Sequence, residues 1–362
     1  MKMNNKIDIP PACEIYSEWP WVQAARPCCY DPAVPWPKIS IVTPSYNQGQ
    51  YIEETIRSIL LQNYPNLEYI IIDGGSTDET IEIIKKYEPW ITYWVSERDR
   101  GQSHAINKGV EKCTGEIFNW LNSDDYYFPD TFYNVARSFL DNPEATTVSG
   151  WENHLQIDGT TTVVEGTFIT ESLLKTIEFV EMAQPSTFFR LECFKNIGPV
   201  AENLHYIMDG EFWVRYLLLY GQGSFCKIEK PLVNFRMHTG SKTVQSSVIY
   251  HFLFERSSIL IDLQKFVGLP ETVTEYWRKV IFNTPTVYEL KREWRINETC
   301  ITKRAVRIYF IKKYTLIQFR NSNKAAALWG TRQLVKNNCF DLFVIRSLVK
   351  LVFKRGKIKN PG

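Results

Sequence analysis

Between residues 38 and 125 the chain alternates short apolar runs with longer amphipathic segments. Four runs rich in β-branched or aromatic residues predict buried strands, at 38–44, 67–73, 91–97 and 115–125, the last ending in a polar turn. Three segments with apolar residues three or four positions apart predict helices, at 51–62, 78–87 and 103–113. Strands that alternate with helices predict βαβ units and therefore a mostly parallel sheet.

A polar cluster follows each of these four strands directly. The clusters read SYNQG at 45–49, DGGSTD at 73–78, ERDRGQS at 97–103 and NSDD at 122–125. Because ligands of such sheets bind beyond the carboxyl ends of the strands, we expect the four loops to form one site.

The pattern is more mixed after residue 150. Residues 163–168 and 184–190 are expected to be extended, 209–219 helical, and 228–238 a strand with an edge proline; from 250 onward the chain is expected to be helical. We therefore expect three parts: an irregular arm at 1–37, an α/β domain at 38–250 and a helical, basic extension at 251–362.

The composition is that of a folded protein, with 44% apolar and 23% charged residues, but the charge is unevenly distributed. Residues 291–362 contain 18 Lys and Arg against 3 Asp and Glu, a net charge of +15, which leaves −13 for the rest of a chain whose total is +2. The basic region is also rich in large apolar residues, which a merely solvated tail does not need. We expect it to bind an anionic surface, membrane lipid before nucleic acid.

Residues 341–355 carry the clearest sign of a membrane-binding helix. On a helix, Arg346, Lys350 and Lys354 share one face. A second face carries Leu342, Ile345, Val349 and Val352. A basic amphipathic helix of this kind suits a membrane interface, although a helix that packs on a core and exposes its cations fits the pattern equally well.

The chain has neither a signal-peptide pattern at residues 1–21 nor a run of 18 apolar residues, and its eight cysteines show no zinc or disulfide spacing. We expect a cytoplasmic protein, with peripheral attachment to the inner face of the membrane as an option.

The motif at 122–125 points to metal chemistry. Asp124 and Asp125 repel each other unless a cation lies nearby, and Mg²⁺ and Mn²⁺ prefer oxygen ligands while leaving positions open for substrate phosphates. The alternative is structural, with Asp125 starting the helix that follows Pro129. The position after the fourth strand favours the metal site.

Several motifs in this order resemble family 2 glycosyltransferases of the GT-A fold. The matching segments are IVTPSYNQGQYIEETIRSILLQNYPNLEYIIIDGGSTDETIEII, WVSERDRGQSHAINKG and GEIFNWLNSDD. The resemblance covers about residues 38–240. It implies a GT-A nucleotide-diphospho-sugar transferase fold, with a Rossmann-like mixed, mostly parallel sheet, and an inverting transfer of sugar to an acceptor hydroxyl.

The resemblance also implies a nucleotide-sugar site. Its residues would be Pro44, Tyr46, Asn47, Asp73, Asp99, Gln102, Asn107 and Asp124. Many members have a second Asp after the one matched by Asp73, where this chain has Gly74. Many also begin the metal motif with Asp, where this chain has Asn122.

The remaining implied roles lie further along the chain. Asp125 and His238 would bind a divalent metal, Mn²⁺ or Mg²⁺, and Asp209 would be the catalytic base that takes the acceptor proton. Gln184 and Glu211 would lie on the acceptor side, Glu211 also being the second candidate base. The structural alternative for Asp209 and Glu211 is helix capping and a first-turn acid, which is compatible with catalysis.

The expected function is transfer from a nucleotide-diphosphate sugar, with UDP favoured over dTDP or GDP, to an acceptor glycan or glycolipid in cell-surface polysaccharide or glycolipid assembly. Three alternatives stay open. They are a non-catalytic scaffold with the same fold, a sugar-phosphate nucleotidyltransferase, and a nucleic-acid-binding protein that uses its basic tail.

Overall fold

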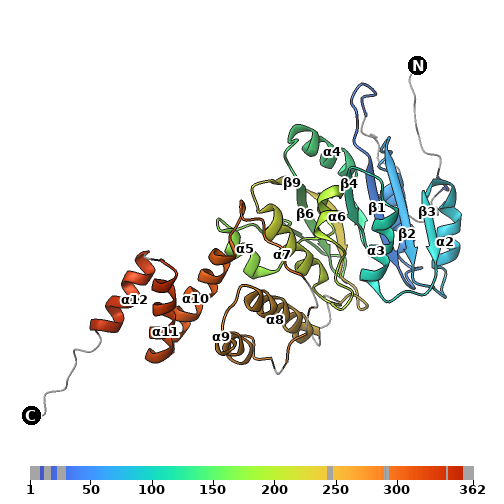
Figure 1. The fold of residues 1–362 in the computed structure, drawn as a ribbon. Coiled ribbons are helices and arrows are strands. Elements are labelled where there is room, and N and C mark those ends of the chain that lie inside the picture. The colour runs from blue at the N-terminus through green and yellow to red at the C-terminus, as the bar shows by residue number, and fades with distance from the viewer. Residues whose placement is uncertain are drawn as a thin grey trace, which may run out of the picture. The chain divides into compact units, whose positions relative to one another are not determined.

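The computed structural model describes residues 9–11, 18–22, 30–242, 248–284, 286–288, 290, 293–339 and 341–353. The chain divides into two compact units, Met1–Phe252 and Leu253–Gly362. The first unit contains the α/β sheet and the second is helical (Figure 1). Val349, Val352 and Lys354, which belong to the expected membrane helix, have side chains outside the described part.

The four predicted strands of the first unit form its parallel core. They are β1 (Ile39–Ser45), β2 (Leu67–Asp73), β3 (Tyr93–Ser96) and β4 (Ile117–Trp120). β1 lies between β2 and β4, so Ile39 is paired with both Leu67 and Ile117. Their carboxyl ends therefore meet at one edge of the sheet, as the sequence predicts.

The sheet continues beyond β4 in the order β8, β6, β9 and β5, with β7 paired to β6. These strands are β5 (Tyr126–Tyr127), β6 (Thr147–Leu155), β7 (Thr161–Val164), β8 (Thr187–Arg190) and β9 (Phe225–Arg236). β8 is antiparallel to both β4 and β6, and β9 is parallel to β6. Two reversals restore the original direction, so β6 and β9 end at the same edge as β1 to β4.

Helices cover both faces because alternate strand residues point in opposite directions. Ile41 packs in a core with α1 (Ile52–Leu60), α2 (Thr80–Tyr87) and α4 (Thr131–Asp141). On the other face, α3 (Gln102–Lys112) packs on β1 and β2, so closely that a Cβ on Gly109 would lie 2.4 Å from Val42 Cγ1. The remaining helices are α5 (Leu173–Phe179), α6 (Leu191–Ile197), α7 (Met208–Tyr220) and the short 3₁₀ turn Glu88–Trp90.

The second half of the unit departs from the predicted elements in detail. β6 and the helices α5 and α6 were not predicted, and only the first part of the expected extended segment 163–168 belongs to β7. Pro231 does lie where a strand tolerates proline, because the pairing of β6 and β9 shifts register around Trp151 and Pro231.

In the described part of the second unit the regular elements are helices, as predicted. They are α8 (Ile249–Phe266), α9 (Glu271–Tyr276), a π-helical turn (Trp277–Ile281), α10 (Lys303–Arg320), α11 (Lys324–Lys336) and α12 (Leu342–Phe353). Ile311, Leu334 and Val344 form the small core of the last three helices. Within the described residues, no helix combines the length and apolarity that a membrane crossing requires.

Candidate active site

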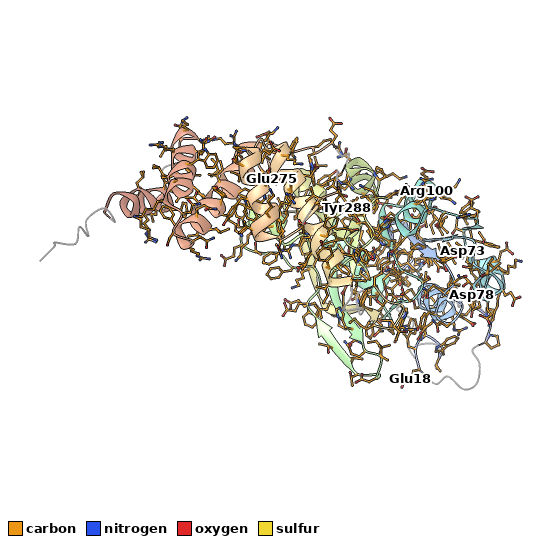
Figure 2. The ribbon with its side chains drawn as sticks, turned by 90° about the horizontal axis from the view of Figure 1, so that it is seen from below. Glu18, Asp73, Asp78, Arg100, Glu275 and Tyr288 are labelled. Carbon is orange, nitrogen blue, oxygen red and sulfur yellow. The ribbon has the colours of Figure 1, made fainter. Side chains whose placement is uncertain are left out.

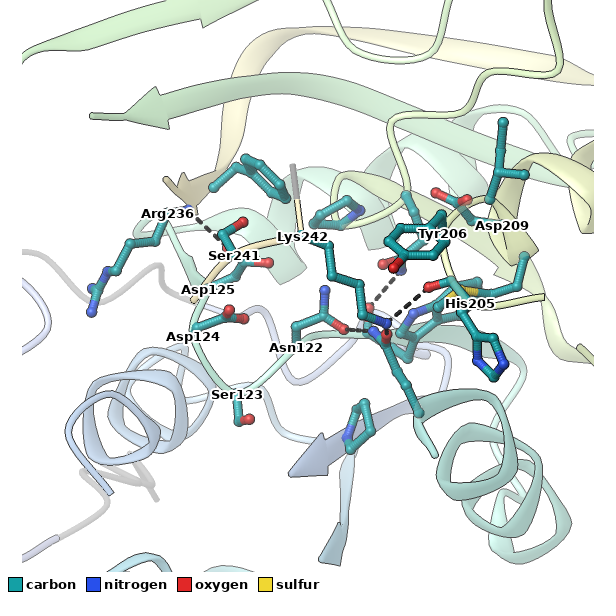
Figure 3. Close-up of a pocket in the computed structure, with 18 of the residues that line it drawn as sticks. Asn122, Ser123, Asp124, Asp125, His205, Tyr206, Asp209, Arg236, Ser241 and Lys242 are labelled. Carbon is teal, nitrogen blue, oxygen red and sulfur yellow. Dashed lines mark hydrogen bonds between the residues drawn. The ribbon is translucent and has the colours of Figure 1, made fainter. Parts of the chain in front are cut away.

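A cavity of about 1180 Å³ lies where the carboxyl ends of the parallel strands meet. All four predicted polar loops contribute to its wall, through Ser45, Gly74, Asp99 and Asn122 among others. The ends of β6 and β9, the loop before β8 and the start of α7 complete it (Figure 3). The expectation that four separate loops form one site is therefore confirmed.

Asp73 ends β2, but its carboxylate is used to shape the loop rather than to line the cavity. It accepts hydrogen bonds from the Gly75 amide (3.0 Å), the Ser76 amide (2.8 Å) and the Ser96 hydroxyl (2.6 Å). Asp78, further along the same loop, accepts a bond from the amide of Gly49. Figure 2 labels both aspartates. The side chain of Asp73 is buried behind the lining residues, where it holds the loop in shape.

Asn47 and Asn107 also act as braces and do not line the cavity. The Asn47 side chain accepts a bond from the Thr77 amide at 2.9 Å and so joins the first two loops. Asn107 binds both the amide (2.8 Å) and the carbonyl (3.0 Å) of Val200, which fixes α3 to the segment after α6. The two residues expected at the nucleotide-sugar site therefore lie next to the cavity, where their amides hold its loops together.

Gly74 explains how the second and third loops fit together. A Cβ at this position would lie 2.9 Å from Oδ2 of Asp99 and 3.3 Å from the Tyr46 ring. The absence of a side chain therefore lets the Asp99 carboxylate and the Tyr46 ring close around this point. Pro44, Tyr46 and Asp99 all line the cavity, as expected of nucleotide-binding residues.

Gln102, at the start of α3, links this region to the metal motif. Its Nε2 donates to Oδ1 of Asn122 at 2.7 Å, and its Oε1 accepts from Nζ of Lys242 at 3.2 Å. Lys242 also donates to the carbonyl of His205 at 2.9 Å (Figure 3). Lys242, which was not predicted as a site residue, thus reaches Gln102, the partner of Asn122 in the metal motif.

Asp124 and Asp125 lie in the turn between β4 and β5 and line the cavity. Oδ1 of Asp125 accepts the Arg236 amide at 2.9 Å, whereas its buried Oδ2 has no hydrogen-bond partner in the described structure. Burial and the charge of Asp124 raise the pKa of Asp125 well above its ordinary value. Since α4 begins at Thr131, the alternative that Asp125 caps this helix is excluded.

His238 comes to the acid pair because β9 ends at the same sheet edge as β4. Its Nε2 lies 2.9 Å from Oδ2 of Asp124, and the Gly240 amide donates to its Nδ1 at 3.2 Å. The ring contacts that of Tyr51, with 4.7 Å between centroids. The sequence therefore correctly groups His238 with the acid pair, in contact with Asp124.

The donor set fits a hard divalent cation. An unpaired, buried carboxylate oxygen on Asp125 beside a second carboxylate is a position that a cation would stabilise. Across the described residues, no cluster of three or more His, Cys, Asp or Glu is arranged to hold a metal ion. That is compatible with Mg²⁺, which proteins bind through one or two carboxylates together with substrate phosphates.

Asp209 lies in the first turn of α7 and lines the cavity. Its Oδ1 accepts the Gly210 amide at 2.8 Å. Loss of hydration raises the pKa of Asp209 to about 6, a shift that this hydrogen bond and Lys242 oppose and Glu152 reinforces. A carboxylate with a pKa in this range is well suited to accept a proton near neutral pH.

Glu211 does not reach the cavity, which corrects its assignment to the acceptor side. Its carboxylate is buried and binds Arg215 through both oxygens, at 2.7 and 2.9 Å. Arg215 also donates to the carbonyls of Ile197 and Pro199. The pair ties α7 to the segment after α6 and so has a structural role.

Gln184 lines the cavity, but its amide group is held by the chain itself. Its Nε2 donates to the Trp120 carbonyl (2.7 Å) and to Oδ1 of Asn119 (3.0 Å), so it fixes the loop before β8 against β4.

Glu152 and His154, on β6, also line the cavity and were not predicted from the sequence. Their spacing of two residues on a strand is the signal that could have found them, had β6 been recognised.

Comparisons with known proteins agree with this architecture. Residues 40–198 match the family model described as glycosyl transferase family 2. An uncharacterized glycosyltransferase of Rickettsia typhi is 30% identical over 220 residues, which is 57% of this chain and 66% of the relative. TuaG of Bacillus subtilis, whose name assigns it to teichuronic acid biosynthesis, is 35% identical over 127 residues, or 34% of this chain and 50% of that protein.

The chain spans only part of these relatives, including 37% of a similar Rickettsia prowazekii protein. Among solved structures, S. aureus TarS 1-349 matches with a TM-score of 0.52 and 18% identity, over 83% of this chain and 92% of TarS 1-349. Residues 40–198 of this protein thus form a domain of glycosyl transferase family 2, and the fold is of the GT-A type with a C-terminal helical region.

Proposed function

We propose that this protein transfers a glycosyl group, with inversion, from a nucleotide-diphosphate donor to a hydroxyl group of an acceptor glycan or glycolipid. One observation carries the proposal. A single cavity contains the loops after β1 to β4, an acid pair and a half-buried carboxylate whose pKa is raised to about 6. The naming of TuaG for teichuronic acid supports a role in cell-surface polysaccharide or glycolipid assembly.

The donor half of the cavity consists of Pro44, Tyr46, Asp99 and Gln102 together with Asp124. UDP is the favoured nucleotide, since TarS has been solved with UDP-GlcNAc and with UDP. Asp73, Asn47 and Asn107 hold the loops of this half in place from outside the cavity.

Asp209 is proposed as the base. Its carboxylate takes the proton of the acceptor hydroxyl while the hydroxyl oxygen forms a bond to the anomeric carbon of the donor sugar. The bond between that carbon and the phosphate oxygen breaks, and the nucleotide diphosphate leaves with the electron pair. Lys242 lines the cavity next to Gln102 of the donor half and would offset negative charge on the diphosphate.

Asp125 and His238 would hold a divalent cation, Mn²⁺ or Mg²⁺, together with the phosphates of the donor. When bound, such a cation offsets the negative charge that develops on the leaving diphosphate. The chain itself holds Asp125 in position. The Arg236 amide donates to its carboxylate, and the Thr55 hydroxyl donates to its backbone carbonyl at 2.6 Å.

The test is release of nucleotide diphosphate from a panel of nucleotide sugars, with Mn²⁺ or Mg²⁺ present. We expect one donor to be turned over, and we expect EDTA and Asp125→Ala each to abolish the turnover. If nucleotide diphosphate binds in a metal-dependent manner but no donor is turned over with any acceptor offered, the scaffold alternative is favoured. Absence of nucleotide binding as well would overturn the transferase proposal.

We also propose that α12 attaches the protein to an anionic membrane surface. Val344 faces the core of the second unit, whereas Leu342, Ile345 and Leu348 are 70%, 50% and 39% exposed at intervals of three residues. The exposed Arg346 and Lys350 lie on the same helix. Exposed apolar side chains beside cations match an interface that is apolar inside and anionic at its surface.

A further inference from the structure

The wall of the cavity formed by β6 and β7 has a composition unlike that of the donor loops. The strand order is β1, β4, β8, β6, so β6 lies three strand positions from β1. Neighbouring strands are about 4.8 Å apart, which puts β6 about 14 Å from β1. Residues from this region that line the cavity are Glu152, His154, Val164, Gly166 and Phe168. None belongs to the loops after β1 to β4, so this wall faces the part of the cavity beyond the donor half.

Glu152 and His154 form the polar part of this wall. They point to the same side of β6, and His154 Nε2 lies 3.1 Å from Oε2 of Glu152. Glu152 is only 6% exposed, and its other contact, to the Ser186 hydroxyl, is long at 3.4 Å. Nδ1 of His154 has no hydrogen-bond partner in the described part of the chain. A buried carboxylate and an imidazole thus retain hydrogen-bonding capacity toward the cavity.

The surroundings of the pair are apolar. Val164, directly opposite Glu152 in the β6–β7 pairing, and Phe168 expose much of their side chains while lining the cavity. Phe179 packs edge-to-face against Phe168, with ring centroids 5.3 Å apart, and the Phe235 ring lies tilted against His154 at 5.1 Å. A polar pair beside an apolar, partly aromatic surface suits a pyranose, which has hydroxyl groups at its edge and C–H groups on its face.

The charge of this wall limits which sugar it can accept. Glu152, Glu181 and Asp209 all line this part of the cavity, whereas Lys242, the cation that also acts on Asp209, is held by Gln102 and the His205 carbonyl. Glu152 already disfavours negative charge nearby, since it contributes to the raised pKa of Asp209. A carboxylate or phosphate on the acceptor would meet three like charges in a partly buried site.

Resting on the proposed function, we propose that the β6–β7 wall binds the acceptor and selects an uncharged glycosyl unit. Glu152 and His154 hydrogen-bond its hydroxyl groups, and Val164 and Phe168 pack against its apolar face. A uronic acid or phosphorylated sugar is disfavoured at the position next to Asp209.

Saturation-transfer NMR on the full chain, with UDP present, tests this proposal. The probes are methyl β-glucoside, methyl β-N-acetylglucosaminide and methyl β-glucuronide at equal concentration. We expect saturation of the two uncharged glycosides and much weaker saturation of the glucuronide. Glu152→Gln and His154→Gln should each weaken glycoside binding about tenfold, because the first replaces a charge-assisted hydrogen bond by a neutral one and the second removes the imidazole nitrogens.

Glu165→Gln is the matched control, since Glu165 follows β7 but is exposed and paired with Lys227 outside the cavity. His154 is partly exposed, so its variant tests the wall even if the buried Glu152 variant fails to fold. Three results would each overturn the proposal. The first is a glucuronide signal equal to or stronger than that of the uncharged glycosides, and the second is unchanged glycoside signals in both variants. The third is no glycoside signal while UDP gives one. Absence of a UDP signal would instead count against the proposed transferase function, and the glycoside signals would still decide the acceptor wall.

Discussion

Asp209 illustrates how the position of one side chain sets its chemistry. It lies at the amino end of α7, where the helix dipole favours the ionised form, yet loss of hydration outweighs this and raises its pKa to about 6. Glu152 and Lys242 act on it in opposite senses. The carboxylate is therefore ionised at neutral pH but close enough to its pKa to accept a proton readily.

Replacing Asp209 with Asn should lower the rate of transfer by about 10²- to 10⁴-fold, the range typical for removal of a general base. Nucleotide binding should be retained, because Asp209 lies outside the donor half. Steady-state kinetics together with calorimetric titration of UDP would measure both. A variant with near-normal transfer would exclude Asp209 as the base.

The pH dependence of transfer should follow the same group. Below a pH of about 6 Asp209 is protonated and cannot accept the acceptor proton, so kcat should fall about tenfold per pH unit there and level off above it.

The raised pKa of Asp209 also means that the folded state binds the proton more tightly than the unfolded state, so the free energy of unfolding should decline as pH rises from about 4 to 6. In Asp209→Asn this decline should be smaller, as urea titrations at several pH values would show.

At this scale the sequence could predict which residues gather, but not all of their orientations. Asp99, Gln102, Asp124, Asp125 and Asp209 do line the cavity. Asp73, Asn107 and Glu211 instead turn toward amides, a backbone segment and an arginine. Polar residues at a strand or helix end serve loop structure as readily as ligand binding, and only the spatial position of their partners decides between the two.

Among the elements, α7 has the most direct influence on the site, because it carries Asp209 on its first turn. Its position depends on the buried pair of Glu211 and Arg215 one turn further along. Arg215 reaches the carbonyls of Ile197, Gly198 and Pro199 and so joins α7 to the end of α6.

Arg215→Ala should destabilise the first unit by roughly 3–5 kcal/mol, because it leaves the Glu211 carboxylate buried without its partner. The double variant Glu211→Gln, Arg215→Met should recover much of the loss, since the isolated charge is then absent. Chemical denaturation of the three proteins measures this. A single variant that is less than about 1 kcal/mol destabilised would show that water or another group satisfies Glu211.

The elements themselves were predictable where their pattern was regular. The alternation at 38–125 gave all four strands and three helices, because each has a clear apolar face and ends in turn residues. β6 was missed because its sequence, TVSGWENHL, is neither uniformly apolar nor alternating. Its environment changes along its length, since it is paired with β8, β9 and β7. Its sheet neighbours come from distant parts of the chain, so local sequence carries little information on them.

For the whole molecule, the uneven charge is the feature with most influence on behaviour. Residues 291–362 carry +15 and the rest −13, so the sheet-containing part is repelled by anionic surfaces to which the helical end is attracted. The exposed apolar residues of α12 add a contribution that salt does not screen.

The full chain should therefore sediment with phosphatidylserine-containing vesicles and not with neutral ones, and binding should weaken between about 0.1 and 0.5 M salt. Leu342→Ser with Ile345→Ser should reduce binding further. Ile157→Ser, which changes an exposed apolar residue far from α12 in sequence, serves as the control. Retention of vesicle binding in the double variant would rule out insertion of α12.

The order of the cavity walls along the chain has a consequence for how specificity can change. The donor loops come first, at 45–125, and the β6–β7 wall with the loop before β8 follows at 147–185. His238 and Lys242, which contact Asp124 and Gln102, come last. A recombination event near residue 145 would therefore keep the four donor loops and exchange the acceptor wall together with His238 and Lys242. A hybrid gene that joins residues 1–145 to the following part of a relative should keep its nucleotide preference and acquire a different acceptor when that relative supplies its own histidine and lysine at these positions.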